Sequence, residues 1–245
     1  MKKIYLVPNI VTTANMFCGF YSIVASHHGE HLTAAWAIIV AGIFDMLDGR
    51  IARLARATSS FGVEYDSLSD LISFGVAPAF LIYTWALEPY GRLGWLAAFL
   101  FVACGALRLA RFNVMGSEAP KSDFQGLPIP GAAGGIASFI ILQNETSWPG
   151  VAGEPVTQSW VLGMALALSS LMVSTVRFSS FKEFNWRSRA RPGYFLIGVL
   201  ALVLLAVKPE ITLFGIFFLY VFGNLIWNSV MILLPILRKE SKRRI

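Results

Sequence analysis

Four aspartates lie close together between residues 44 and 70, beside segments that are otherwise strongly apolar. Asp45 and Asp48 are three residues apart, and Asp66 and Asp70 are four apart, so on helices each pair shares one face. Four carboxylates facing each other across two helices repel unless a cation lies between them. Divalent cations that prefer oxygen ligands, Mg²⁺ or Mn²⁺, suit this set. We therefore predict a metal site held by these four aspartates.

Glycines and an arginine accompany the acids. Gly49 directly follows Asp48, and Gly62 lies between the two acidic pairs. A missing side chain lets a ligand or a second backbone come close. Arg53 follows one turn after Gly49, where a guanidinium can bind a phosphate through two hydrogen bonds. The alternative is a purely structural pair of polar helices, but ion pairs would not need four acids and two glycines at this spacing.

The composition indicates a membrane protein. The chain has 245 residues, of which 56% are hydrophobic and 14% charged, well below the charged share of a soluble domain. Several apolar runs approach the length of a transmembrane helix, and the run from Val7 is too long for a cleaved signal. The net charge of +6 does not indicate nucleic-acid binding, because the basic residues flank apolar segments and suit anionic lipid headgroups.

We predict an all-α fold, a polytopic transmembrane helical bundle forming one domain over residues 1–245. Eight helices are expected, at about 7–26, 32–54, 63–87, 93–114, 129–143, 159–178, 193–207 and 211–235. An even number puts both termini on one side, and every basic residue except Arg92 and Lys208 falls on that side. The positive-inside rule then places both termini and the acidic cluster on the cytoplasmic side of the cytoplasmic (inner) membrane.

Other polar residues lie near the acidic stretch. Asn9, Thr12 and Asn15 follow one side of the first predicted helix at its cytoplasmic end. Helix capping and interhelical hydrogen bonds explain them as well as ligand contact does. Ser59 lies between Arg53 and Gly62, where its hydroxyl can donate a hydrogen bond to a diphosphate, although a turn explains it nearly as well.

The acidic stretch resembles the signature of the CDP-alcohol phosphotransferase family, D-x2-D-G-x2-A-R-x8-G-x3-D-x3-D, position for position from Asp45 to Asp70. The resemblance implies transfer of a phosphatidyl group from CDP-diacylglycerol to an alcohol, with release of CMP. It implies a six-helix core, with helices 193–235 accessory, and commonly a homodimer. It implies that Asp70 is the general base. The residues expected to bind the CDP diphosphate are Asn9, Thr12, Asn15, Gly49, Arg53, Ser59 and Gly62.

Three further stretches resemble the phosphatidylserine synthase branch of this family: LSDLISFGVAPAF, LRLARFN and FQGLPIPGAA. On that resemblance the acceptor is L-serine and the product is phosphatidylserine. A carboxylate on the acceptor needs a cation, and Arg108 and Arg111, three residues apart, are the candidates, with Gln125 as a weaker polar partner. Positive-inside flanking would account for the two arginines without any site.

Two alternatives stay open. The first keeps the chemistry and changes the acceptor to glycerol-3-phosphate, inositol phosphate or choline, or the donor to an ether lipid. The basic residues at 187–191 would suit a phosphorylated acceptor. The second is a divalent cation transporter, which would predict acids near the membrane midplane and often a repeated half. Here the acids lie toward the helix ends, and the sequence has no visible repeat.

Overall fold

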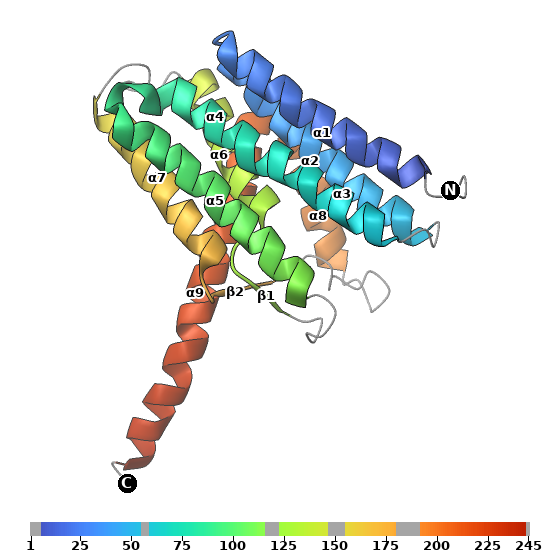
Figure 1. Cartoon of the computed structure of the whole chain (residues 1–245). Helices are drawn as coiled ribbons and strands as arrows, with labels where there is room; N and C mark the ends of the chain where they lie inside the picture. Colours follow the sequence, from blue (N-terminus) through green and yellow to red (C-terminus); the bar gives the residue numbers. More distant parts are fainter. Residues whose placement is uncertain (1–5, 55–58, 116–122, 147–154, 180–191, 244–245) are drawn as a thin grey trace.

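The computed structural model describes residues 6–54, 59–115, 123–146, 155–179 and 192–243. Within these ranges the chain forms a helical bundle (Figure 1), which confirms the predicted fold class and the eight helical segments. The segments are α1 (Leu6–His27), α2 (His31–Leu54), a continuous run from α3 (Ser60–Asp70) through α4 (Ala77–Ile82) to Tyr90, α5 (Arg92–Met115), α6 (Ile129–Thr146), α7 (Pro155–Val173), α8 (Pro192–Val207) and α9 (Pro209–Arg243).

The third segment stays helical through a proline. Two π-helical turns, η2 (Leu71–Val76) and η3 (Tyr83–Leu87), flank α4, and a 3₁₀ turn η4 (Glu88–Tyr90) ends the run. Pro78 has no N–H to donate, and just before it the Ala77 N–H donates to the carbonyl five residues back, at Ile72. The wider turn absorbs the proline, so the helix continues past Asp70.

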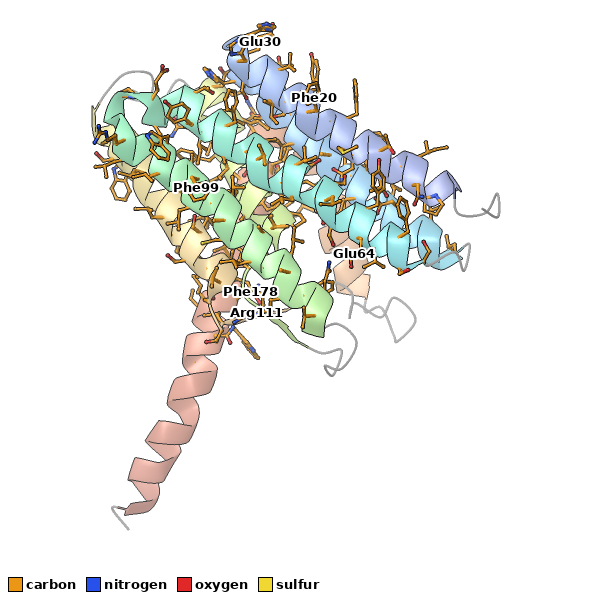
Figure 2. All side chains as sticks on the ribbon, viewed as in Figure 1. Phe20, Glu30, Glu64, Phe99, Arg111 and Phe178 are labelled. Atoms are coloured by element: carbon orange, nitrogen blue, oxygen red, sulfur yellow. The ribbon has the colours of Figure 1, made fainter. Side chains whose placement is uncertain are left out.

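Four helical stretches in the described ranges are long and apolar enough to cross a membrane: His31–Ile51, Ser60–Tyr90, Arg92–Val114 and Pro209–Asn228. Shorter apolar helices are Ser159–Val173 and Gly198–Val207. Large apolar side chains lie on the outside, among them Phe20 of α1 and Phe99 of α5 (Figure 2), whose exposed fractions are 59% and 62%. Such faces suit lipid, and the chain is an integral membrane protein.

Helix α1 is held against α3 and η2 by close backbone contact and by hydroxyl groups. A Cβ at Gly19 would lie 2.5 Å from the Cα of Ser73, a separation that only glycine allows. The Ser73 hydroxyl donates to the carbonyl of Asn15, and the Ser69 hydroxyl donates to that of Thr12, both at 3.0 Å. These bonds fix the height of the α3 aspartates relative to α1.

A short ribbon joins two loops at one end of the bundle. β1 (Asp123–Gln125) pairs antiparallel with β2 (Arg177–Ser179), with Phe124 opposite Phe178. The prediction of a helix to residue 178 is wrong at its end, because α7 stops at Val173. There the Ser174 hydroxyl bonds the carbonyl of Leu171, and Gly126 donates its N–H to Val176 at 2.9 Å. These bonds turn the chain from the helix into the ribbon.

Helix α6 runs through the middle of the bundle. Its side chains at Ile129, Ile136 and Ile140 are fully buried, and α2, α5 and α9 pack around it. The far part of α9 extends away from the bundle (Figure 1). The packed end of α6 lies against both α5 and the third segment, which carry most of the predicted site residues.

Candidate active site

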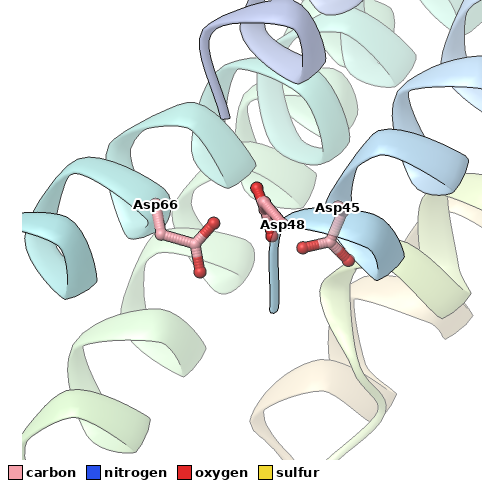
Figure 3. A group of neighbouring side chains, drawn as sticks. All are labelled: Asp45, Asp48 and Asp66. Carbon is pink, nitrogen blue, oxygen red and sulfur yellow. The ribbon is translucent and has the colours of Figure 1, made fainter. Parts of the chain in front are cut away.

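Three of the predicted aspartates form one tight group. Asp45 and Asp48 come from α2 and Asp66 from α3, and one carboxylate oxygen from each lies within 4.8 Å of the others. Figure 3 shows the three side chains converging from the two helices. Asp48 is buried, whereas Asp45 and Asp66 are half-buried. Carboxylates this close repel strongly at low dielectric, and an all-oxygen set is the donor chemistry that a hard divalent cation needs, so the residues fit a metal ion.

Asp70 lies beside this group, one helical turn beyond Asp66. The carboxylates of Asp45, Asp48 and Asp66 are its electrostatic neighbours. The mutually close oxygens of the group do not include Asp70, and its Oδ1 instead accepts a hydrogen bond of 3.3 Å from Nδ2 of Asn15. The structure thus brings all four predicted aspartates into one region. Three of them form the tight group, whereas Asp70 lies beside it and is hydrogen-bonded to Asn15.

Helix α1 holds two of the aspartates. The Thr12 hydroxyl lies 3.0 Å from Oδ2 of Asp48 and 3.1 Å from the carbonyl of Pro8, so it donates to one or the other. Asn15 is fully buried and donates to Asp70. Both residues were expected to bind CDP. In this structure their side chains contact aspartates, so they act on the site from the α1 side.

Removing the Thr12 hydroxyl tests this support. Thr12→Val keeps the side-chain shape and leaves the Asp48 carboxylate without that donor. Partners that orient metal ligands are typically worth 10- to 100-fold in affinity, so we expect binding of Mn²⁺ to weaken by about tenfold. Electron paramagnetic resonance titration with Mn²⁺ measures this directly.

The matched control is Thr212→Val on α9. Among the hydrogen bonds described, the Thr212 hydroxyl has one acceptor, the carbonyl of Lys208 four residues earlier, at 2.8 Å. The Thr12 hydroxyl has a carbonyl at the same spacing, that of Pro8, but also lies near Asp48. We expect wild-type Mn²⁺ affinity for the control. Equal affinity for Thr12→Val and the control would show that the Thr12–Asp48 contact contributes nothing to the metal site.

The start of α3 gathers three more predicted residues. Ser59 is the N-cap of α3, and its Oγ accepts a hydrogen bond from the N–H of Gly62 at 3.0 Å. In this structure Ser59 therefore has the local, turn-forming role that was the alternative to diphosphate binding. A Cβ on Gly62 would lie 3.2 Å from this Oγ and 3.8 Å from Oδ1 of Asn9. The glycine therefore allows Ser59 and Asn9 to lie close to the start of α3, where the backbone N–H groups of a helix favour a phosphate group.

The two remaining diphosphate residues lie on α2. Gly49 is exposed, and a Cβ there would meet nothing within 4 Å, so no second backbone explains this glycine and the space is open to a ligand. Arg53 lies in α2, but its side chain falls outside the described residues.

The two candidate arginines of α5 differ in setting. Arg108 is half-buried, and its electrostatic neighbours are the Asp70 carboxylate and the phenol of Tyr220, with the Phe112 ring 5.9 Å from its Cζ. Arg111 is exposed, and its Nη1 donates to the carbonyl of Val173 at 3.4 Å, at the end of α7. Figure 2 labels Arg111 at this end of the bundle. Of these two arginines, Arg108 is therefore the one that interacts electrostatically with an aspartate of the site, Asp70.

Gln125 lies in β1, opposite Arg177 in the ribbon, and its side chain falls outside the described residues.

Two residues of this region were not among the predicted site residues. Asn113 of α5 donates to the Ser67 hydroxyl at 3.0 Å and so ties α5 to α3 one residue from Asp66. Its place in the LRLARFN stretch, on the same helix as Arg108, was a usable signal. Tyr220 of α9 lies beside Arg108. No local pattern marks it, because a tyrosine in an apolar helix is common in membrane proteins.

Comparison with known proteins gives consistent matches. The sequence profile of the CDP-alcohol phosphatidyltransferase family matches residues 5–176. A CDP-diacylglycerol–serine O-phosphatidyltransferase of Helicobacter pylori is 35% identical over 233 residues, 95% of each chain. A protein of the same name from Bacillus subtilis is 36% identical over 72% of this chain and 92% of its own. An archaetidylserine synthase of Methanothermobacter thermautotrophicus is 37% identical over 70% of this chain and 69% of its own.

Proposed function

The chain belongs to the CDP-alcohol phosphatidyltransferase family, and from that premise we propose that it makes phosphatidylserine and CMP from CDP-diacylglycerol and L-serine. The observation that carries the proposal is the match over 95% of both chains to a protein named for this reaction. The converging aspartates supply the chemistry that such a transfer needs. A diphosphate substrate must have its charge neutralised before an alcohol can attack phosphorus.

Asp45, Asp48 and Asp66 are the proposed metal ligands, with Asp70 as a fourth. When bound there, Mg²⁺ or Mn²⁺ neutralises diphosphate charge and polarises the P–O bond that breaks. Thr12 is proposed to orient the Asp48 carboxylate by donating its hydroxyl hydrogen to Asp48 and not to the carbonyl of Pro8. The three carboxylates come from two helices that α1 clamps together, so their separation is set before any ligand binds.

Asp70 is the proposed general base. Its Oδ1 is held by Asn15, so the carboxylate has a fixed orientation and its Oδ2 can accept a proton. The hydroxyl oxygen of serine forms a bond to the β-phosphorus and gives its proton to Asp70. The bond from that phosphorus to the CMP oxygen breaks, and CMP leaves with the electron pair.

The diphosphate is proposed to lie between the start of α3 and Gly49 of α2. Asn9, Ser59 and Gly62 offer small polar groups and backbone N–H donors there, and Arg53 a guanidinium. The lipid tails of the donor stay in the bilayer.

Arg108 is proposed to bind the carboxylate of serine. It neighbours Asp70, and in serine the hydroxyl and the carboxylate are separated by only two carbons. An Arg108 salt bridge to the carboxylate would therefore bring the hydroxyl to the base. Arg111 and Gln125 are proposed as outer residues of the same acceptor site.

We propose further that the six helical segments from α1 to α7 are the catalytic core and that the protein is a homodimer. The family match ends at residue 176, just beyond α7, which supports this division. Both termini and the active site are proposed to face the cytoplasm, as the distribution of basic residues predicts.

The test is an assay of purified protein with CDP-diacylglycerol, Mn²⁺ or Mg²⁺ and radiolabelled L-serine. We expect labelled lipid and one CMP for each lipid formed. Glycerol-3-phosphate, inositol phosphate and choline are assayed in parallel, and an ether-linked CDP lipid replaces the donor in a second series. CMP formed with another acceptor, or only with the ether lipid, would correct the substrate. Absence of CMP under every condition would overturn the enzymatic function and favour the alternative of a divalent cation transporter.

A further inference from the structure

The last helix is docked closely on α6 at the level of the active site. A Cβ at Gly134 of α6 would overlap the ring of Phe217, and a Cβ at Gly131 would lie 3.4 Å from Cε1 of Tyr220. Val221, the next residue of α9, is buried. Two glycines of α6 thus admit the aromatic face of α9, and this fixes the height of Tyr220 along the bundle.

The same end of α6 contacts the helices that carry Asp70 and Arg108. Ile129 is fully buried, and a Cβ at Gly105 of α5 would lie 2.6 Å from its Cδ1, while one at Gly75 would lie 3.6 Å from it. Gly105 precedes Arg108 by one turn, and Gly75 follows Asp70 by little more than one turn. The helical segments that carry Asp70, Arg108 and Tyr220 therefore pack around the start of α6.

We propose that Tyr220 is a positioning residue of the acceptor site, whose hydroxyl orients the guanidinium of Arg108 toward the carboxylate of the amino-acid acceptor. The inference rests on the proposed function. It gives α9, which lies beyond the family match and carries no motif, a direct part in acceptor binding.

The surroundings of the two side chains support this role. Arg108 interacts electrostatically with Asp70 and with Tyr220, so its guanidinium has the base and the phenol as neighbours. The Phe112 ring, 5.9 Å from its Cζ, offers an aromatic surface to the planar group. The Tyr220 ring is itself held by the buried Phe178, with ring centroids 6.1 Å apart. A guanidinium bounded in this way has few orientations left, which favours one direction of carboxylate binding.

Tyr220→Phe keeps the ring and its packing and removes only the hydroxyl. We expect the KM for serine to rise by about tenfold, as loss of a hydrogen bond that holds a charged group predicts. We expect kcat and the KM for CDP-diacylglycerol to change by less than about twofold, because the donor side is untouched. The control is Tyr21→Phe, the same chemical change at an exposed residue of α1, for which all three constants should match wild type.

A double-mutant cycle tests whether Tyr220 acts through Arg108. Arg108→Ala should raise the KM for serine, and adding Tyr220→Phe to it should raise the KM no further. Additive effects, or a wild-type KM for Tyr220→Phe alone, would overturn the inference while the wild-type enzyme still uses serine. A wild-type protein that does not use serine would instead overturn the proposed function.

Discussion

Asp70→Asn is expected to abolish the formation of lipid and of CMP. Asparagine has the shape of aspartate but cannot accept the proton of the acceptor hydroxyl, and it also removes a negative charge beside the metal ligands. General bases contribute roughly 10²- to 10⁴-fold, so we expect kcat to fall by about a thousandfold or more. Incorporation of labelled serine and release of CMP measure the two products independently.

The control for this change is Glu64→Gln, which also replaces a carboxylate by an amide on α3. Glu64 is exposed and lies outside the signature, and the Asn113 amide is 3.5 Å from its Oε2. The control should keep wild-type activity to within about twofold, because a surface carboxylate contributes little. If Asp70→Asn retained more than a tenth of the wild-type rate, Asp70 would not be the base.

Metal binding by the variant separates the two proposed roles of Asp70. If the residue acts mainly as the base, Asp70→Asn should still bind Mn²⁺ through Asp45, Asp48 and Asp66. If it is also an indispensable ligand, Mn²⁺ binding and activity should disappear together.

Removing divalent metal is expected to have an effect of the same size. Chelation should stop the reaction, and Mn²⁺ or Mg²⁺ should restore it, because three close carboxylates cannot bind a diphosphate without a cation between them. The metal should also raise the melting temperature, because a cation that binds the folded state relieves the repulsion among these side chains. Activity and thermal unfolding, each measured against Mn²⁺ concentration, provide two readouts.

Asp48→Asn offers the sharper form of this experiment. Asp48 is 4% exposed and bonded to Thr12, so its carboxylate has little solvent to screen it. We expect the Mn²⁺ concentration for half-maximal activity to rise by at least about tenfold, and the stabilisation by Mn²⁺ to shrink in parallel. Full activity in the presence of chelator, with protein shown by elemental analysis to be metal-free, would refute the metal site.

The helices of this protein and its acidic cluster could be predicted from local sequence. The eight helices were predicted because a membrane helix is defined by a long apolar run, which needs no knowledge of its partners. The acids of α2 and α3 were predicted to share faces because helical periodicity alone fixes spacings of three and four residues. The same local rules predicted the acidic cluster, since Asp45, Asp48 and Asp66 stand on consecutive helices joined by a short connection.

The contacts between helices were decided only by the tertiary structure. An apolar run indicates that a helix lies in the membrane, but it does not indicate which face of the helix packs against which neighbour. The hydrogen bonds of Thr12 to Asp48 and of Asn15 to Asp70 could therefore not be predicted from the sequence. Arg108 and Arg111 have helical spacing for a common face, yet packing against α7 leaves only Arg108 near Asp70. The end of α7 depends on pairing with a ribbon strand about fifty residues earlier. Tyr220 reaches the site because two glycines on α6 admit α9, a long-range fit that no local pattern encodes.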